Sequence, residues 1–135
     1  MILRQFCVGL LAVLLCGCEG WSRETIAWES AYQAIHAIDG LQTLEIARHP
    51  NCYEEVAGAH WLGSHPSEGD VAVWWGTMAA LHAGVTQALV SNDASVGWMR
   101  FWQLVTLIQP AYSVGKNWSI GLHVGNVHHE GACVS

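Results

Sequence analysis

Charged residues are scarce in this chain of 135 residues: they make up 12% of it, with five Lys and Arg against eleven Asp and Glu. Soluble domains usually carry about twice that share. The basic residues are isolated from one another, so no basic surface that could neutralise nucleic-acid phosphates is expected. Anionic lipid headgroups would not attract such a chain either. We therefore expect no nucleic-acid partner, and any membrane attachment has to be hydrophobic or covalent.

Apolar and aromatic residues are correspondingly frequent. Hydrophobic residues form 52% of the chain, and eight of its residues are Trp. Trp is favoured where one side of its ring is apolar and the other is wet, as at a membrane interface. The length suits one domain. We therefore expect a single domain associated with a membrane, although a soluble protein with a very dense core would have the same composition.

Residues 1–17 have the composition of a secretory signal. A positive charge, Arg4, precedes an almost wholly apolar run at 6–15, and small residues follow that run. This order of charge, apolar run and small residues is typical of a signal peptide. The run is too short to cross a bilayer, which takes about 20 helical residues. We therefore interpret 1–17 as a signal peptide and 18–135 as the mature domain.

The end of this signal resembles the bacterial lipobox, in which a small residue precedes a cysteine that is lipidated and becomes the new N-terminus. Gly17 takes the small-residue position and Cys18 the lipidated one. Cys16 departs from the usual lipobox residue, which leaves ordinary cleavage nearby as the alternative. Lipidation of Cys18 predicts a membrane-anchored protein of the cell envelope, with membrane lipid as its first partner. It does not distinguish the inner from the outer membrane.

The mature chain is expected to form about three helices, which predicts an all-α fold: a small helical bundle embedded in the membrane. The first helix covers 24–48, where apolar residues recur every three or four positions until Pro50 ends the pattern. An irregular connection rich in glycine follows at 51–69. The third helix is expected at about 95–114, with a kink at Pro110.

The second helix, at 71–90, is the strongest candidate for a membrane span. It contains no charged residue and is long enough to cross a bilayer. Its start is expected at Ser67 or Gly69. Small residues recur at every fourth position, a spacing that lets two membrane helices approach closely; they are Gly76, Ala80 and Gly84. The alternative interpretation is a buried core helix of a soluble bundle.

Two motifs in this region belong together. In the run at 28–49, Thr43 follows Asp39 by four residues, and an acidic loop then leads to a Leu-Gly-x-x-Pro-Ser turn. The turn consists of Leu62, Gly63, Pro66 and Ser67. This combination resembles small bacterial and phage-encoded membrane proteins of unassigned function, although Ala59-His60 replaces their usual Asn-Pro before the turn. The resemblance implies a helical, membrane-associated fold and carries no activity.

His36, Asp39 and Thr43 share one face of the first helix because they are three and four residues apart. An ionisable group inside a membrane is costly, so it is by default a functional candidate that needs a partner. His82, in the middle of 71–90, is the expected partner of Asp39. Three amides complete the predicted polar network: Gln42, Gln87 and Gln109. Such a network either carries a function or only joins the helices through hydrogen bonds.

A second group combines histidines and cysteines from two distant parts of the chain. Its members are His49, Cys52, His128, His129 and Cys133. In an oxidising envelope compartment, Cys52 and Cys133 would most simply form a disulfide. Unpaired thiols are a second interpretation. A zinc site of His49, Cys52, His129 and Cys133 is a third, because thiolate and imidazole suit zinc. The spacing is looser than that of a zinc finger, and we predict no cofactor.

Nothing in the sequence completes a catalytic set, so we expect a non-enzymatic protein. The sequence has neither a nucleophile elbow nor a glycine-rich phosphate loop, and the adjacent Glu54 and Glu55 are typical of a solvated loop. The leading hypothesis is an envelope lipoprotein whose helices pack in or on the membrane and present a loop to a partner protein. A metal-binding envelope protein is one alternative. A phage-type factor that modifies the host envelope, which rests on the resemblance alone, is the other.

Overall fold

The computed structural model describes residues 20–55, 58–124 and 126–127. In this part of the chain the fold is all-α, as predicted. The long helices are α2 (Arg23–Arg48), α4 (Glu68–Ser91) and α5 (Val96–Ser119), and the one-turn helix α3 (Ala59–Leu62) lies between the first two. After α5, the two-residue strands β1 (Leu122–His123) and β2 (Asn126–Val127) pair antiparallel. The predicted signal peptide and Cys18 lie outside the described residues.

Each long helix begins at a serine that caps its first turn. The Ser22 hydroxyl accepts a hydrogen bond from the Thr25 N–H at 3.0 Å, and Ser95 is the N-cap of α5. At α4, Ser67 and Asp70 form a capping box, in which each side chain accepts from the backbone N–H of the other. Of the two predicted starts, Ser67 and Gly69, the structure therefore confirms Ser67.

The sequence predicts the end of α2 correctly but not the end of α5. α2 ends at Arg48, just before Pro50, as predicted. α5 continues through Pro110 to Ser119, so its predicted end at about 114 was wrong. The reason is tertiary: Ser113 and Asn117 are buried, and the Asn117 amide donates to the Gln42 side chain of α2 at 3.2 Å. Those contacts hold the last turns of the helix.

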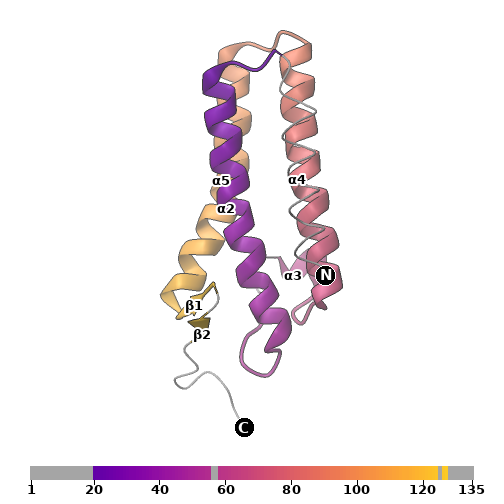
Figure 1. Ribbon diagram of the computed structural model, residues 1–135, viewed down its shortest axis with the longest axis vertical. Coiled ribbons are helices and arrows are strands. Elements are labelled where there is room, and N and C mark those ends of the chain that lie inside the picture. The colour runs from indigo at the N-terminus through magenta and orange to yellow at the C-terminus, as the bar shows by residue number, and fades with distance from the viewer. Residues whose placement is uncertain (1–19, 56–57, 125, 128–135) are drawn as a thin grey trace.

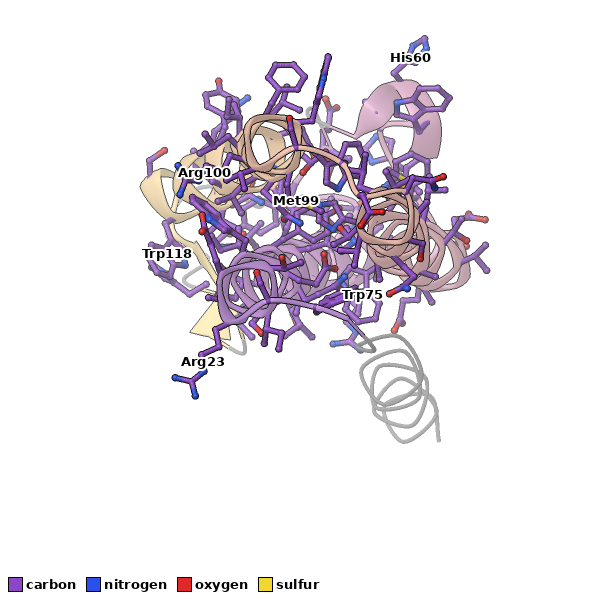
Figure 2. The ribbon with its side chains drawn as sticks, turned by 90° about the horizontal axis from the view of Figure 1, so that it is seen from above. Arg23, His60, Trp75, Met99, Arg100 and Trp118 are labelled. Atoms are coloured by element: carbon purple, nitrogen blue, oxygen red, sulfur yellow. The ribbon has the colours of Figure 1, made fainter. Side chains whose placement is uncertain are left out.

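Helix α2 is the shared element of the bundle. It packs along both α4 and α5, whereas the backbones of α4 and α5 come close to each other at few places. The long helices follow the longest axis of the molecule; the start of α2 and the α4–α5 connection lie at one end, and α3 and the strands lie toward the other (Figure 1). Viewed from above, the helices surround a common interior, and Arg23 and His60 point outward (Figure 2). We call the end with the α4–α5 connection the connection end.

The interior of this bundle is polar. Among the described residues, buried polar and charged side chains outnumber buried hydrophobic ones, and Glu29, Thr86 and Gln103 are at most 2% exposed. A small hydrophobic cluster of Ile46, Tyr53 and Leu122 lies beside the strands. Large hydrophobic side chains are instead exposed, most of them on α5. Hydrogen bonds between side chains are therefore a major part of what joins the helices.

No helix in the described ranges is both long and apolar enough to cross a membrane. The prediction of a membrane span at 71–90 is accordingly unsupported. Its apolar run is interrupted by the polar residues His82, Thr86 and Gln87.

Close helix packing occurs at a different glycine from those predicted. A Cβ atom added at Gly76 or Gly84 would meet nothing within 4 Å, and Ala80 between them is exposed, so this stripe faces away from the other described helices. A Cβ atom at Gly40 of α2 would instead lie 2.6 Å from Nε1 of Trp75 on α4. The Trp75 indole is held in place because its N–H donates to the His36 carbonyl at 2.8 Å.

Gly40→Ala is therefore expected to lower the free energy of unfolding by about 1–3 kcal/mol, because the Trp75 ring has to move. Unfolding by denaturant in mild detergent, followed by circular dichroism, measures this. Gly76→Ala and Gly84→Ala are matched controls in open space, where alanine favours helix over glycine by about 0.5–1 kcal/mol. An equal loss in all three variants would contradict the contact at Gly40.

Candidate functional site: a polar interior beside an acidic cavity

The centre of the interior is a hydrogen-bonded contact between Glu29 of α2 and His82 of α4. Nδ1 of His82 lies 2.9 Å from Oε2 of Glu29, and both side chains are at most 3% exposed. Glu29 also accepts from the Gln33 amide at 2.7 Å and from the Thr86 hydroxyl at 2.9 Å. A carboxylate buried this deeply is stable only when its oxygens are satisfied. Internal donors occupy both oxygens of Glu29.

The same network reaches α5. Nε2 of His82 lies 2.8 Å from the Thr106 hydroxyl, which donates to the Trp102 carbonyl one turn earlier at 2.7 Å. Beside it, the Trp102 indole and the Gln103 amide both donate to the Thr86 hydroxyl, at 3.1 and 3.2 Å. One hydrogen-bonded unit thus fixes the rotation of all the long helices about their axes.

Aromatic rings enclose the His82 imidazole. Its ring stacks on Tyr32 with centroids 3.5 Å apart and on Trp102 at 5.1 Å. Tyr32 stacks in turn on His36 at 5.4 Å, and His36 stacks on Trp75 at 5.8 Å. Burial raises the pKa of Tyr32 to about 12, so its phenol stays neutral. Tyr32, His36 and Trp75 of this stack also line the cavity described below, whereas His82 does not.

Burial and hydrogen bonding act in opposite directions on Glu29. Burial alone raises the pKa of this carboxyl group. Hydrogen bonds from His82 and Gln33, with the charge of His82, outweigh burial and hold the pKa below its ordinary value. Glu29 is therefore ionised at neutral pH.

A cavity of about 250 Å³ lies beside the stack, between α2, α3, α4 and α5. Its polar lining includes the carboxyl groups of Asp39 and Glu55. Both carboxylate oxygens of Glu55 are hydrogen-bonded: one accepts from the Gly58 N–H at 2.6 Å and the other from the Thr43 hydroxyl at 3.4 Å. Oδ1 of Asp39 is buried and accepts no hydrogen bond from the described residues. Asp39 is therefore the less satisfied of the two acids.

Burial raises the pKa of Asp39 to about 6, and the neighbouring charge of Glu55 adds to this shift. A hydrogen bond from Ser113 opposes it. On the same face, burial lowers the pKa of His36, which keeps that imidazole neutral. The cavity therefore gains negative charge as Asp39 ionises near neutral pH.

The comparisons with known proteins give no relative from which to transfer a role. No protein-family model matches this chain, and searches of curated proteins and of solved structures found no significant match. The resemblance to small bacterial and phage membrane proteins therefore stays a prediction. What the site can do has to follow from its own geometry.

The structure brings together three of the four residues predicted as a network. His36, Asp39 and Thr43 all line the cavity. His82 lies behind Tyr32 and contacts Glu29 instead of the predicted partner, Asp39. Of the predicted amides, Gln109 lines the cavity, Gln42 bonds to the Leu122 carbonyl, and Gln87 accepts from the Trp21 indole.

Two acids of the site were missed in the sequence. Glu29 precedes His36 by seven residues, so it lies on the face already noted for His36, and extending that face by two turns would have found it. Glu54 is exposed, as expected of a solvated loop, but Glu55 next to it is only 5% exposed. The expectation of a solvated loop was wrong for Glu55, because the side chains of adjacent loop residues point in different directions.

The second predicted group falls largely outside the described residues, which include neither His128, His129 nor Cys133. Cys52 is disulfide-bonded, so the interpretation as an unpaired thiol is wrong for it. The pairing with Cys133 stays a prediction. Nδ1 of His49 lies 3.0 Å from the backbone carbonyl oxygen of Glu45. Within the described ranges, no group of three or more His, Cys, Asp or Glu residues is placed to hold a metal ion.

Glu29→Ala is expected to lower the free energy of unfolding by about 3–5 kcal/mol, because it leaves His82, Gln33 and Thr86 without their buried acceptor. Replacing both partners, as in Glu29→Leu with His82→Phe, should cost less than Glu29→Ala alone. Denaturant unfolding monitored by circular dichroism tests both statements. A double variant less stable than the single one would show that the pair itself adds net stability.

Asp39→Asn is expected to stabilise the protein at pH 7.5 by about 1–2 kcal/mol. The folded-state pKa of Asp39 is raised to about 6 from 3.8. Its contribution to stability is therefore fully present below about pH 4 and is lost as the pH rises through 6. Melting curves from pH 4 to 8 should show the two proteins converging at low pH. Glu54→Gln, at an exposed acid, should change little; a pH-independent difference for Asp39→Asn would contradict the shift.

Proposed function

We propose that the mature chain is a non-enzymatic, membrane-associated protein of the cell envelope. Lipidated Cys18 anchors it, and the outward face of α5 contacts lipid. The observation that carries this proposal is the exposed apolar stripe on α5. Its members are Trp98, Phe101, Leu104, Val105, Ile108 and Tyr112, each at least 46% exposed. They recur every one to four residues and form one continuous face of the helix.

The opposite face of α5 supports this orientation. Gln103, Ser113 and Asn117 are buried there, and Thr106 is bonded to His82 of α4. Rotating α5 to hide the apolar stripe would expose these bonds and break the network. The stripe is therefore fixed outward by the polar interior, and water is a poor solvent for it.

The positions of the charged residues on α5 are compatible with contact between its apolar face and lipid. Between Arg100 and Lys116, α5 carries no charged residue. Arg100 pairs with Glu24 of α2, its Nε 2.7 Å from a carboxylate oxygen, near the connection end. The net charge of −6 provides no attraction to anionic headgroups. Lipid binding therefore depends on apolar area and acyl chains, and should be insensitive to salt.

The start of the described chain is compatible with an anchor at the same end. A Cβ atom at Gly20 would lie 3.6 Å from Val90, close to the end of α4. Cys18 precedes Gly20 by two residues in the sequence. Acyl chains on Cys18 would enter lipid near the connection end, where the stripe on α5 begins. We assign the protein no catalytic step, because Glu29 and His82 bond to groups of the protein itself.

Ile108→Glu tests the lipid contact in mature protein without acyl chains, residues 19–135, mixed with neutral phosphatidylcholine vesicles. The unsubstituted chain should float with the vesicles at low and high salt alike. Ile108→Glu should lower the floating fraction several-fold, because a charge on the stripe is costly to bury in lipid. Ala34→Glu, which adds the same charge at an exposed site on α2, should float normally.

Equal flotation of both variants would overturn the lipid contact. So would a lipid-free dimer that Ile108→Glu dissociates while flotation is unchanged, because the stripe would then be a protein interface. The anchor is tested separately by intact-mass analysis of protein extracted from membranes. An acylated chain beginning at Cys18 is expected, and an intact Met1 or an unmodified Cys18 would rule out the anchor.

A further inference from the structure

We propose that the cavity beside α3 binds a small substituted ammonium ion, with Asp39 as the counter-charge and tryptophan rings as the walls. This site is separate from the lipid-facing stripe, so each proposal can fail without the other. The cavity holds about 250 Å³, which is the volume of several water molecules and suits a metabolite-sized ligand or a lipid headgroup.

The lining selects the sign of the ligand's charge. Two acids, Asp39 and Glu55, line the cavity, and none of the described residues that line it is Lys or Arg. Glu55 is already bonded to Gly58 and Thr43. Oδ1 of Asp39 is buried without a hydrogen-bond partner among the described residues, so it is the acceptor that a bound cation would satisfy. An anion would meet only repulsion there.

The walls select the type of cation. Trp61 of α3 stacks on Trp74 of α4 with ring centroids 5.7 Å apart, and Trp75 forms the wall near His36. Trp61 is 70% exposed, which places it at the mouth of the cavity. The faces of such rings attract ammonium groups, methylated ones especially, because these lose little hydration on burial.

A metal ion fits this lining poorly. Within the described part of the chain, no cluster of three or more His, Cys, Asp or Glu residues could hold one. Indole rings supply no oxygen ligands, which hard cations such as Ca²⁺ and Mg²⁺ require in number. An organic cation needs one counter-charge and a shaped apolar wall, and the cavity provides both.

The pH dependence follows from the groups that face Asp39. They are Tyr32 and His36 on its own helix and Glu55 from the loop, while α4 and α5 contribute only neutral groups, among them Trp75 and Ser113. Tyr32 and His36 stay neutral at neutral pH. Burial raises the pKa of Asp39 to about 6. Affinity for a cation should therefore fall as the pH drops through about 6, where Asp39 becomes protonated.

Calorimetric titration of the mature chain in maltoside micelles tests the proposal, with choline as the probe and 3,3-dimethylbutanol as the uncharged molecule of the same shape. Choline should bind saturably and at least about tenfold more tightly than the alcohol at pH 7.5. Asp39→Asn should weaken choline binding by at least about tenfold, and Trp61→Ala by several-fold. Glu54→Gln and Trp118→Ala, at an acid and a tryptophan outside the cavity, should leave it unchanged.

Equal affinity for choline and the alcohol, or unchanged choline binding by a folded Asp39→Asn variant, would overturn the proposal. So would the absence of saturable binding. Short-chain phosphatidylcholine distinguishes the two sources of the ammonium group. If it binds more tightly than free choline, the site is assigned to a lipid headgroup. If the two bind equally, the site is assigned to a free solute. Circular dichroism of each variant separates loss of binding from loss of fold.

Discussion

The buried contact between the Glu29 carboxylate and the His82 imidazole is the constraint on which the arrangement of the helices depends. A lone charge at this depth would be strongly destabilising, so α2 and α4 have to meet in the register that joins these two side chains. Thr106 extends the requirement to α5 through its contact with the other nitrogen of His82. The hydrophobic cluster beside the strands is too small and too near one end to fix this register. Polar contacts therefore determine the geometry of the bundle.

The same constraint explains why apolar residues are found outside. Every helix has two sides, and in α5 the side that meets the other helices is taken by Gln103, Thr106 and Asn117. The large hydrophobic residues have no place left except the surface. The scarcity of charge in the composition and the polar interior are thus two aspects of one arrangement. Many polar side chains bond to one another inside the bundle, and much of the large hydrophobic side-chain area lies on the outer surface.

The sequence predicts the helices well because their limits are set locally. Ser67 with Asp70 starts α4, and Pro50 stops α2, through contacts with their near neighbours. It also predicts which face of α2 is polar, since His36, Asp39 and Thr43 lie at helical spacing. The partner of His82 could not be predicted in this way. The partner depends on how one helix is rotated relative to another, and the spacing of residues within a single helix gives no information on that rotation.

Other errors have the same origin. Gly76 and Gly84 have the spacing of a close contact, but the network around His82 turns them outward, and Gly40 takes the contact instead. α5 extends past Pro110 because Asn117 finds a bond on α2. The burial of Glu55 depends on the path of a loop that carries no periodic pattern. Sequence patterns thus predicted where the long helices lie and one polar face of α2, whereas contacts between elements required the assembled structure.

The position of α2 between α4 and α5 has a consequence for biogenesis. α2 is synthesised before both of its neighbours, and the carboxylate at position 29 has only Gln33 of its own helix as a partner until His82 and Thr86 have been made. A hairpin of α4 and α5 alone would lack most of the contacts that hold either helix in place. The chain therefore gains little from folding in stages during synthesis, and its helices have to settle together after the last of them has emerged.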